Sequence, residues 1–106
     1  MVIIPTEWLI DYIARTGVSR ISFDKVVVLK DGFFTFSVRN DYLVILDGYG
    51  NGKRIEQVCM KIAKSRGLKK IRFFSRRNPK AFVRKFGVKV IGKTKEGFYL
   101  FEKEVV

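Results

Sequence analysis

Residues 47–52 read Asp-Gly-Tyr-Gly-Asn-Gly and stand directly before a stretch of helical periodicity. Three glycines occupy alternate positions of this segment: Gly48, Gly50 and Gly52. Glycines let backbone amides approach a ligand without interference from a Cβ atom, and the N–H groups and dipole of a helix start favour a phosphate. Lys53 and Arg54 follow in the first helical turn, where positive charge opposes the dipole unless an anion is bound. The pattern predicts a phosphate-binding loop or, more simply, a tight turn with Asn51 capping the helix.

The residue types that the sequence lacks limit its chemistry. It contains no histidine and one cysteine, Cys59. There is therefore no imidazole base, no Cys/His zinc cluster and no internal disulfide, which excludes serine-protease and zinc-hydrolase activities. We expect no metal site. No apolar run approaches the roughly 18 residues of a membrane span and no charged leader precedes the first apolar residues, so we expect a soluble, cytoplasmic protein.

Positive charge is concentrated in one part of the chain. Of the net charge of +12, residues 53–95 carry +15, with 16 basic residues and one acid, and the other residues carry −3. Such a local field attracts a polyanion, whether nucleic acid, an acidic protein or a phosphate-bearing cofactor. The basic residues that we expect to form a nucleic-acid or anion patch are Arg72, Arg76, Arg77, Lys80 and Arg84.

Apolar periodicity divides the first half of the chain into a helix and three strands. Residues 6–16 repeat apolar side chains at helical spacing, with Thr6 as the expected N-cap. Runs of β-branched and aromatic residues, separated by Asp-Gly and Asn-Asp turn pairs, predict strands over residues 26–29, 33–38 and 42–46. We expect these strands to form an antiparallel meander that the first helix covers.

The second half alternates helices and strands. The expected elements are a helix over 53–66, a strand over 70–75, a short helix over 79–86 and a closing hairpin over 88–91 and 98–101. Asn78 before a proline is a typical helix start. A strand-helix-strand crossover implies a parallel pair inside an otherwise antiparallel set. We therefore expect one α/β (α+β) domain over residues 1–106, with a mixed, mostly antiparallel sheet of about six strands and about three helices.

This order of elements, together with two motifs, resembles the Gcn5-related N-acetyltransferases. The resemblance covers roughly residues 42–104. Residues 48–52 are similar to that family's acyl-CoA pyrophosphate loop, and residues 76–92 are similar to its Asn-x-x-Ala helix and the strand that follows. The elements before residue 42 fit the family's first half, shortened by an initial strand. The resemblance implies an acyl-CoA N-acyltransferase fold and the transfer of an acetyl group from acetyl-CoA to an amine.

The resemblance also implies where acetyl-CoA binds. The co-substrate would lie in a V-shaped gap between the strands at 42–46 and 70–75, with its pantetheine amides paired to the first strand. Its pyrophosphate would rest on the amides of residues 50–54, and basic side chains near the loop would neutralise its 3′-phosphate. The cofactor-binding residues implied in this way are Leu46, Gly48, Gly50, Asn51, Gly52, Lys53, Arg54 and Asn78.

Acetyl transfer to an amine needs a base for the ammonium proton and an acid or water for the CoA sulfur. The tyrosine that often serves as this acid in the family is replaced here by Val83, and Asp47 places a carboxylate where the family usually has Arg or Gln, facing the expected pyrophosphate. The remaining candidates are Asp47 or Asp41 as the base and Tyr49, Tyr42 or Cys59 as the acid. We take Asp47 and Tyr49 as the catalytic residues, although these three residue types are also common in turns, strands or cores.

Two other hypotheses stay open. Small acetyltransferase-like proteins of tailed bacteriophages, including internal virion proteins, are similar in size and in the terminal Asn-helix-Gly-hairpin, and a non-catalytic virion protein would use its basic surface on DNA or on other virion proteins. An unrelated nucleic-acid binder would stack bases on Phe73 and Phe74, although phenylalanines in a central strand are usually core. For an acetyltransferase, the expected acceptor is an acidic protein or a small amine.

Overall fold

A computed structural model describes residues 3–17 and 25–106 of the chain. In this part it has three helices and six strands: α1 (Thr6–Thr16), β1 (Lys25–Leu29), β2 (Gly32–Arg39), β3 (Tyr42–Tyr49), α2 (Gly52–Ser65), β4 (Lys70–Ser75), α3 (Pro79–Phe86), β5 (Lys89–Lys93) and β6 (Tyr99–Glu104). The strands form one sheet in the order β1-β2-β3-β4-β6-β5. β3 and β4 are parallel and the other neighbours are antiparallel, which confirms the expected mixed sheet.

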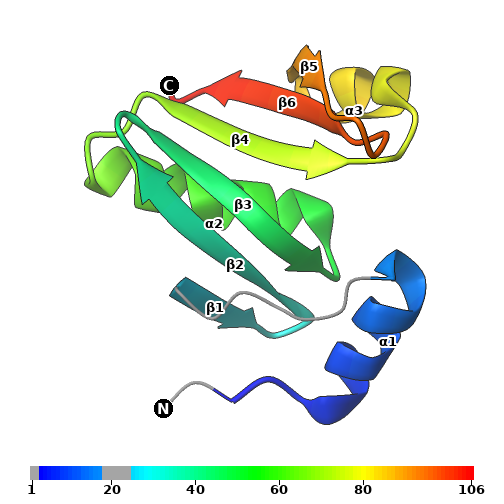
Figure 1. Cartoon of the computed structure of the whole chain (residues 1–106). Coiled ribbons are helices and arrows are strands. Elements are labelled where there is room, and N and C mark those ends of the chain that lie inside the picture. Colours follow the sequence, from blue (N-terminus) through cyan, green and yellow to red (C-terminus); the bar gives the residue numbers. More distant parts are fainter. Residues whose placement is uncertain (1–2, 18–24) are drawn as a thin grey trace.

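The two faces of the sheet pack against different helices. Because side chains alternate along a strand, Phe33 and Phe34 of β2 point to opposite faces. Phe34 belongs to a core with Ile55 and Cys59 of α2, and Phe33 packs against Tyr12 of α1. α2 therefore lies behind the sheet in Figure 1, and α1 packs on the other face beside the ends of β2 and β3.

β3 is longer than the sequence pattern predicted. Its last residues pair with β2, with Asp47 opposite Thr35 and Tyr49 opposite Phe33. The prediction that residues 47–49 lie in a loop was therefore wrong, because the aromatic run of β2 offers ladder partners that local turn propensity does not reveal. Only Gly50 and the N-cap residue separate the strand from α2.

The helix ends follow local capping chemistry in two of three cases. Asn51 and Asn78 cap α2 and α3, with Oδ1 accepting a backbone N–H at 3.2 and 3.0 Å respectively. Thr6 does not cap α1, since Pro5 holds the N-cap position and makes no side-chain capping bond. Gly87 ends α3 in the left-handed conformation, with φ +63°. No helix within residues 3–17 and 25–106 is both long and apolar enough to cross a membrane.

Candidate functional site

The parallel strands β3 and β4 separate part-way along their length. Their pairing runs from Tyr42 opposite Lys70 to Ile45 opposite Phe73 and ends there. Beyond this point β3 continues against β2 and β4 against β6, and a β-bulge leaves Leu46 without a partner on β2. Figure 1 shows the two strands side by side at one end and apart at the other. We call this divergence the strand split, and it lies between the two strands where the V-shaped gap was predicted.

Apolar side chains flank the strand split and stay exposed to solvent. Leu46 is 40% exposed and Phe74, the first residue of β4 past the split, is 45% exposed. Large apolar residues at the middle of a sheet are usually covered. The strand split therefore presents uncovered apolar surface on both of its sides.

The first turn of α2 begins just after β3 ends and has amides without helical partners. The first backbone bond of the helix runs from the Ile55 N–H to the Asn51 carbonyl at 3.0 Å, and the Arg54 N–H donates to the Asn51 side chain at 3.2 Å. The amides of Gly52 and Lys53 precede these bonds, so no helical acceptor serves them. The predicted phosphate donors were the amides of residues 50–54. Within α2, the Arg54 amide belongs to the cap and those of Gly52 and Lys53 have no helical acceptor, and anion binding by any of these amides stays a prediction.

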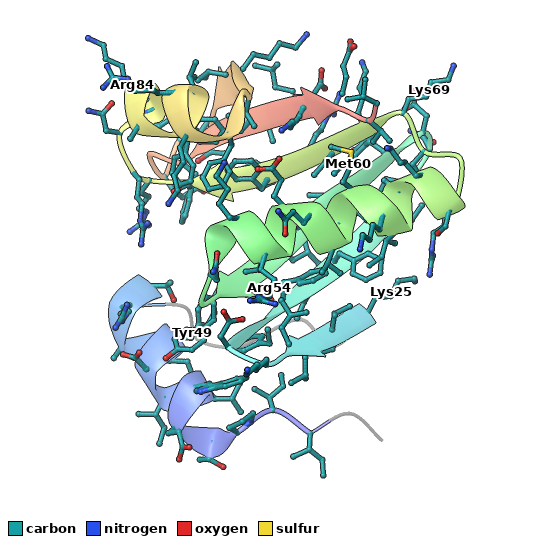
Figure 2. The ribbon with its side chains drawn as sticks, turned by 180° about the vertical axis from the view of Figure 1, so that it is seen from behind. Lys25, Tyr49, Arg54, Met60, Lys69 and Arg84 are labelled. Atoms are coloured by element: carbon teal, nitrogen blue, oxygen red, sulfur yellow. The ribbon has the colours of Figure 1, made fainter. Side chains whose placement is uncertain are left out.

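The two cations of this turn point in different directions. The Arg54 Nε lies 3.2 Å from Oδ1 of Asp31 in the turn between β1 and β2. The Lys53 Nζ lies 6.0 Å from the ring centroid of Phe86, at the end of α3. Figure 2 labels Arg54 near the start of α2, on the side of the molecule that holds Tyr49 and α1. We call the contact between Gly52 of α2 and Phe86 of α3 the α2–α3 seam. Lys53 is the cation beside this seam, whereas Arg54 is paired with Asp31 in the β1–β2 turn.

The glycines around α2 have neighbours within the protein itself. Gly50 has φ +102°, and a Cβ atom there would collide with the carbonyl oxygen of Asp31. A Cβ atom on Gly52 would lie 3.2 Å from Cζ of Phe86, whereas one on Gly48 would lie 3.7 Å from Cδ1 of Ile55, an ordinary contact. Chain packing therefore accounts for Gly50 without any ligand. Gly52 lies against Phe86 of α3, and Gly48 lies against Ile55 of α2.

Phe86 joins the two helices at this point. Its ring stacks on Phe82 with centroids 5.6 Å apart, and Phe82 in turn packs against Phe73 and Phe101 at 5.5 and 5.1 Å. This row of rings runs from the strands beside the split to Gly52 at the start of α2. Phe86 therefore covers the seam where the predicted phosphate amides lie.

Asp47 is buried against α1 and not against α2. Its side chain is 7% exposed, and it accepts hydrogen bonds from the Tyr12 hydroxyl at 2.8 Å and the Thr35 hydroxyl at 2.6 Å. Burial raises the pKa of Tyr12, and the bond to Asp47 raises it further. The expectation that Asp47 faces a pyrophosphate was wrong, because its neighbour Gly48 faces α2 and side chains alternate along β3. Its role as a base stays a prediction.

Tyr49 also faces α1. Its hydroxyl donates to Oδ2 of Asp11 at 2.7 Å, and its ring lies 5.7 Å from that of Phe33 and 6.1 Å from that of Trp8. The bond to Asp11 raises the pKa of Tyr49, and the same bond lowers the pKa of Asp11. The structure thus brings both predicted catalytic residues, Asp47 and Tyr49, to one face of β3.

The other predicted proton donors and acceptors lie elsewhere. Cys59 is fully buried between α2 and the sheet, and burial raises the pKa of its thiol to about 12. Asp41 lies at the opposite end of β3 from the strand split, in the turn from β2. Tyr42 begins β3 and its ring lies 4.1 Å from the guanidinium of Arg72. None of these three is brought near Asp47 or the α2 start.

Asn78 and Val83 belong to α3. The Asn78 side chain is engaged in the cap of this helix, and its proposed contact with the pantetheine arm stays a prediction. Val83 is 44% exposed and lines a groove with Val90 of β5, so the position at which the family often has a tyrosine faces away from the row of rings at the split. Among the described residues no group of three or more His, Cys, Asp or Glu side chains could hold a metal ion.

Arg72 of the predicted basic patch lies on the α1 side of the sheet. Phe73 packs against Phe82 of α3, so its neighbour Arg72 points to the opposite face. There the Arg72 Nε lies 2.8 Å from Oε2 of Glu102, whose side chain is only 4% exposed. Arg72 therefore forms an ion pair with a buried carboxylate.

The other four cations of the patch follow the end of β4. The Arg76 guanidinium lies 4.3 Å from the ring centroid of Phe98, and Arg77 is exposed. Lys80 and Arg84 line the groove beside α3. The structure brings Lys80 and Arg84 together and leaves Arg72 on another face, and anion binding by these residues stays a prediction.

The fold matches those of solved acetyltransferases. An aminoglycoside 6′-acetyltransferase type Ii matches with TM-score 0.62 and 17% identity over 76% of this chain and 67% of its own. The PaiA N-acetyltransferase from Thermoplasma acidophilum, solved in complex with coenzyme A, matches with TM-score 0.54 and 24% identity over 70% of this chain and 53% of its own. An acetyltransferase from Bacillus cereus matches with TM-score 0.60 and 20% identity over 92% of this chain and 89% of its own.

These likenesses establish the architecture. The chain has the acyl-CoA N-acyltransferase fold that the resemblance to Gcn5-related N-acetyltransferases implied. It spans 53% of the length of the PaiA enzyme and 67% of that of the aminoglycoside enzyme. No protein-family model and no curated protein sequence matches the chain.

Proposed function

We propose that this protein is a small N-acetyltransferase that moves an acetyl group from acetyl-CoA to an amine. The observation that carries the proposal is the strand split, which opens after Ile45 and Phe73 and leads directly to a helix start with unengaged amides at Gly52 and Lys53. The fold is shared with an N-acetyltransferase solved in complex with coenzyme A. In this chain an unpaired strand edge comes directly before a helix start, and the N–H groups of a helix start suit a phosphate.

Acetyl-CoA would be held by groups on the α2 side of the sheet. The β3 backbone past Ile45 has no partner on β4, so its groups can pair with pantetheine amides. The amides of Gly52 and Lys53 and the Lys53 ammonium would bind the pyrophosphate. When bound, acetyl-CoA supplies an activated thioester at the strand split, where the exposed apolar side chains Leu46 and Phe74 would exclude water from it. Phe74 would do so from the α1 side, since its neighbour Phe73 packs against α3.

The amine would approach from the α1 side. Asp11, Asp47 and Tyr49 lie on this side, although Asp11 is paired with Arg15 at 3.0 Å and both Asp47 oxygens accept hydroxyl bonds. An ammonium group would therefore have to compete for the Asp11 carboxylate. The ammonium must lose a proton before its nitrogen attacks the thioester carbonyl carbon, the C–S bond breaks, and the sulfur then gains a proton. Asp47 is the proposed base and Tyr49 the proposed acid, and positioning supplies most of the rate.

Thermal unfolding with and without acetyl-CoA tests the proposal. A ligand at about 100 times its dissociation constant stabilises the folded state by about 2.7 kcal/mol, which raises the melting temperature of a chain of this size by several degrees. Acetyl-CoA at micromolar to millimolar concentration should therefore raise the melting temperature. Free thiol should then appear when primary amines are added. An unchanged melting temperature at millimolar acetyl-CoA rules the proposal out.

A further inference from the structure

A groove lies between α3 and the edge strand β5, on the far side of α3 from the row of rings at the strand split. Its volume is about 430 Å³, and it is lined by Pro79, Lys80, Val83, Arg84 and Val90. We call it the α3–β5 groove. Figure 2 shows Arg84 on the outer side of α3, the side that faces away from α2.

The groove has an apolar lining that the chain leaves uncovered. Val83 is 44% exposed and Val90 is 41% exposed, because Phe82 and Phe86 take the sheet side of α3. No residue of α3 is fully buried. Two exposed branched side chains facing one hollow are a typical anchor point for an apolar side chain of a partner.

Two cations border the groove without acidic partners. Lys80 and Arg84 stand four residues apart on α3 and so share a face with Val83 between them. Residues 79–93 contain five basic residues and no acid. Lys89 of β5 lies 3.7 Å from a Glu102 oxygen, but in residues 3–17 and 25–106 no acid pairs with Lys80 or Arg84. The groove therefore offers uncompensated positive charge beside its apolar lining.

The charge and shape of the groove select one kind of occupant. A second copy is disfavoured because each carries a net charge of +12, and because β5 has a β-bulge between Val90 and Gly92 and lysines at both ends, devices that oppose edge pairing. Nucleic acid would reach the two cations through its phosphates but would leave the apolar lining unused, because bases stack on aromatic side chains and the lining offers valine and proline. An acidic peptide with an apolar residue satisfies both the cations and the valines.

We propose that the α3–β5 groove is a docking site for an acidic segment of a partner protein, which places an apolar side chain on Val83 and Val90 and carboxylates on Lys80 and Arg84. The site is separate from the strand split and needs no acetyl-CoA. Under the proposed function, the groove would hold a protein partner while an amine is acetylated at the strand split.

Fluorescence anisotropy with a labelled peptide of alternating Glu-Glu-Leu units tests this proposal. The Lys80→Glu/Arg84→Glu variant should bind the peptide at least about tenfold more weakly, since like charges then face each other. The matched control is Lys61→Glu/Lys64→Glu, which changes the net charge equally at exposed positions of α2. The control should bind within about twofold of the unchanged protein, since its charges lie outside the groove. Replacing Leu by Ser in the peptide should weaken binding about threefold or more.

Three results would overturn the proposal. Equal losses in the two charge-reversal variants would show a diffuse electrostatic attraction and no site. Equal binding of the Leu and Ser peptides would show that the valines do not contribute. A single-stranded oligonucleotide of equal charge that binds more tightly than the peptide, and depends on Lys80 and Arg84, would assign the groove to nucleic acid. Unchanged melting curves of all variants without ligand ensure that the comparison concerns folded protein.

Discussion

The Tyr12 hydroxyl of α1 lies 2.8 Å from Oδ1 of Asp47 on β3, and this bond is buried. The Tyr49 hydroxyl of β3 makes the same kind of bond in the opposite direction, to Asp11 of α1 at 2.7 Å. α1 and β3 therefore each contribute one tyrosine hydroxyl and one carboxylate to this pair of bonds. This reciprocal pair fixes α1 over the end of β3, directly before the loop that leads into α2.

Tyr12→Phe should destabilise the protein more than Tyr49→Phe. Removing the Tyr12 hydroxyl leaves the buried Asp47 carboxylate with one fewer donor, which costs about 1.5–3 kcal/mol in the free energy of unfolding. The Tyr49 bond is only partly buried, so its loss should cost about 0.5–1 kcal/mol. Urea unfolding curves measure both values. Equal losses, or a larger loss for Tyr49→Phe, would contradict the burial argument.

Alkaline pH should destabilise the protein through Tyr12. Its pKa in the folded state is raised above the ordinary value of 10.0 because the ring is buried beside Asp47. A raised pKa means that the folded state holds this proton more tightly than the unfolded state, so the contribution to stability is complete below pH 10 and declines as the pH rises above it. The free energy of unfolding of Tyr12→Phe should therefore fall less steeply above pH 10 than that of the unchanged protein. Identical slopes would exclude Tyr12 as the source.

Gly50→Ala should be far more damaging than Gly48→Ala. Gly50 has φ +102°, and a Cβ atom there meets the Asp31 carbonyl oxygen, so the loop or the β1–β2 turn must move. We expect a loss of about 2–4 kcal/mol at position 50, and less than about 1 kcal/mol at position 48, where the new Cβ makes an ordinary contact. Thermal unfolding of the two variants measures the difference. A mild effect at position 50 would show that the chain can rearrange its turn.

The elements were predictable from sequence where the signal is local. Asn51 and Asn78 cap their helices through their own side chains, and the apolar spacing of α2 and α3 is visible in the chain itself. The strand end at Tyr49 was not predictable, because it depends on ladder partners in β2. The hydrogen bonds from Thr35 and Tyr12 to Asp47 were not predictable either, because their partners stand 12 and 35 residues apart in the sequence. Residue 86 was placed in the helix predicted over 79–86, but the contact of Phe86 with Gly52 could not be predicted because it depends on the tertiary fold.

Phe86→Ala should separate ligand binding from stability. The ring packs on Phe82 and covers Gly52, so its loss should lower the free energy of unfolding by about 1–3 kcal/mol. The same change uncovers the start of α2, so under the proposed function the affinity for acetyl-CoA should rise about threefold or more, since binding no longer displaces the ring. Titration calorimetry measures the affinity. A weaker affinity would mean instead that the ring is part of the binding surface.

Lys53→Gln and Arg54→Gln should differ in their effect on acetyl-CoA binding, although both remove one positive charge from the first turn of α2. Lys53 lies beside the α2–α3 seam, near Phe86, whereas Arg54 is drawn to Asp31 in the β1–β2 turn. We expect Lys53→Gln to weaken acetyl-CoA binding about five- to tenfold, as the loss of a charge-assisted phosphate contact does, and Arg54→Gln to weaken it less than about twofold.

The two variants are matched controls for each other, because their net charge and helix position are nearly the same. Calorimetric titration with acetyl-CoA at low and moderate salt measures the difference, and the difference should shrink as salt screens the Lys53 ammonium. If Arg54→Gln is the weaker binder, the pyrophosphate lies on the β1–β2 turn side of α2 and not at the seam. Equal affinities for both variants would mean that neither side chain touches a phosphate, and the anion would then be held by backbone amides alone.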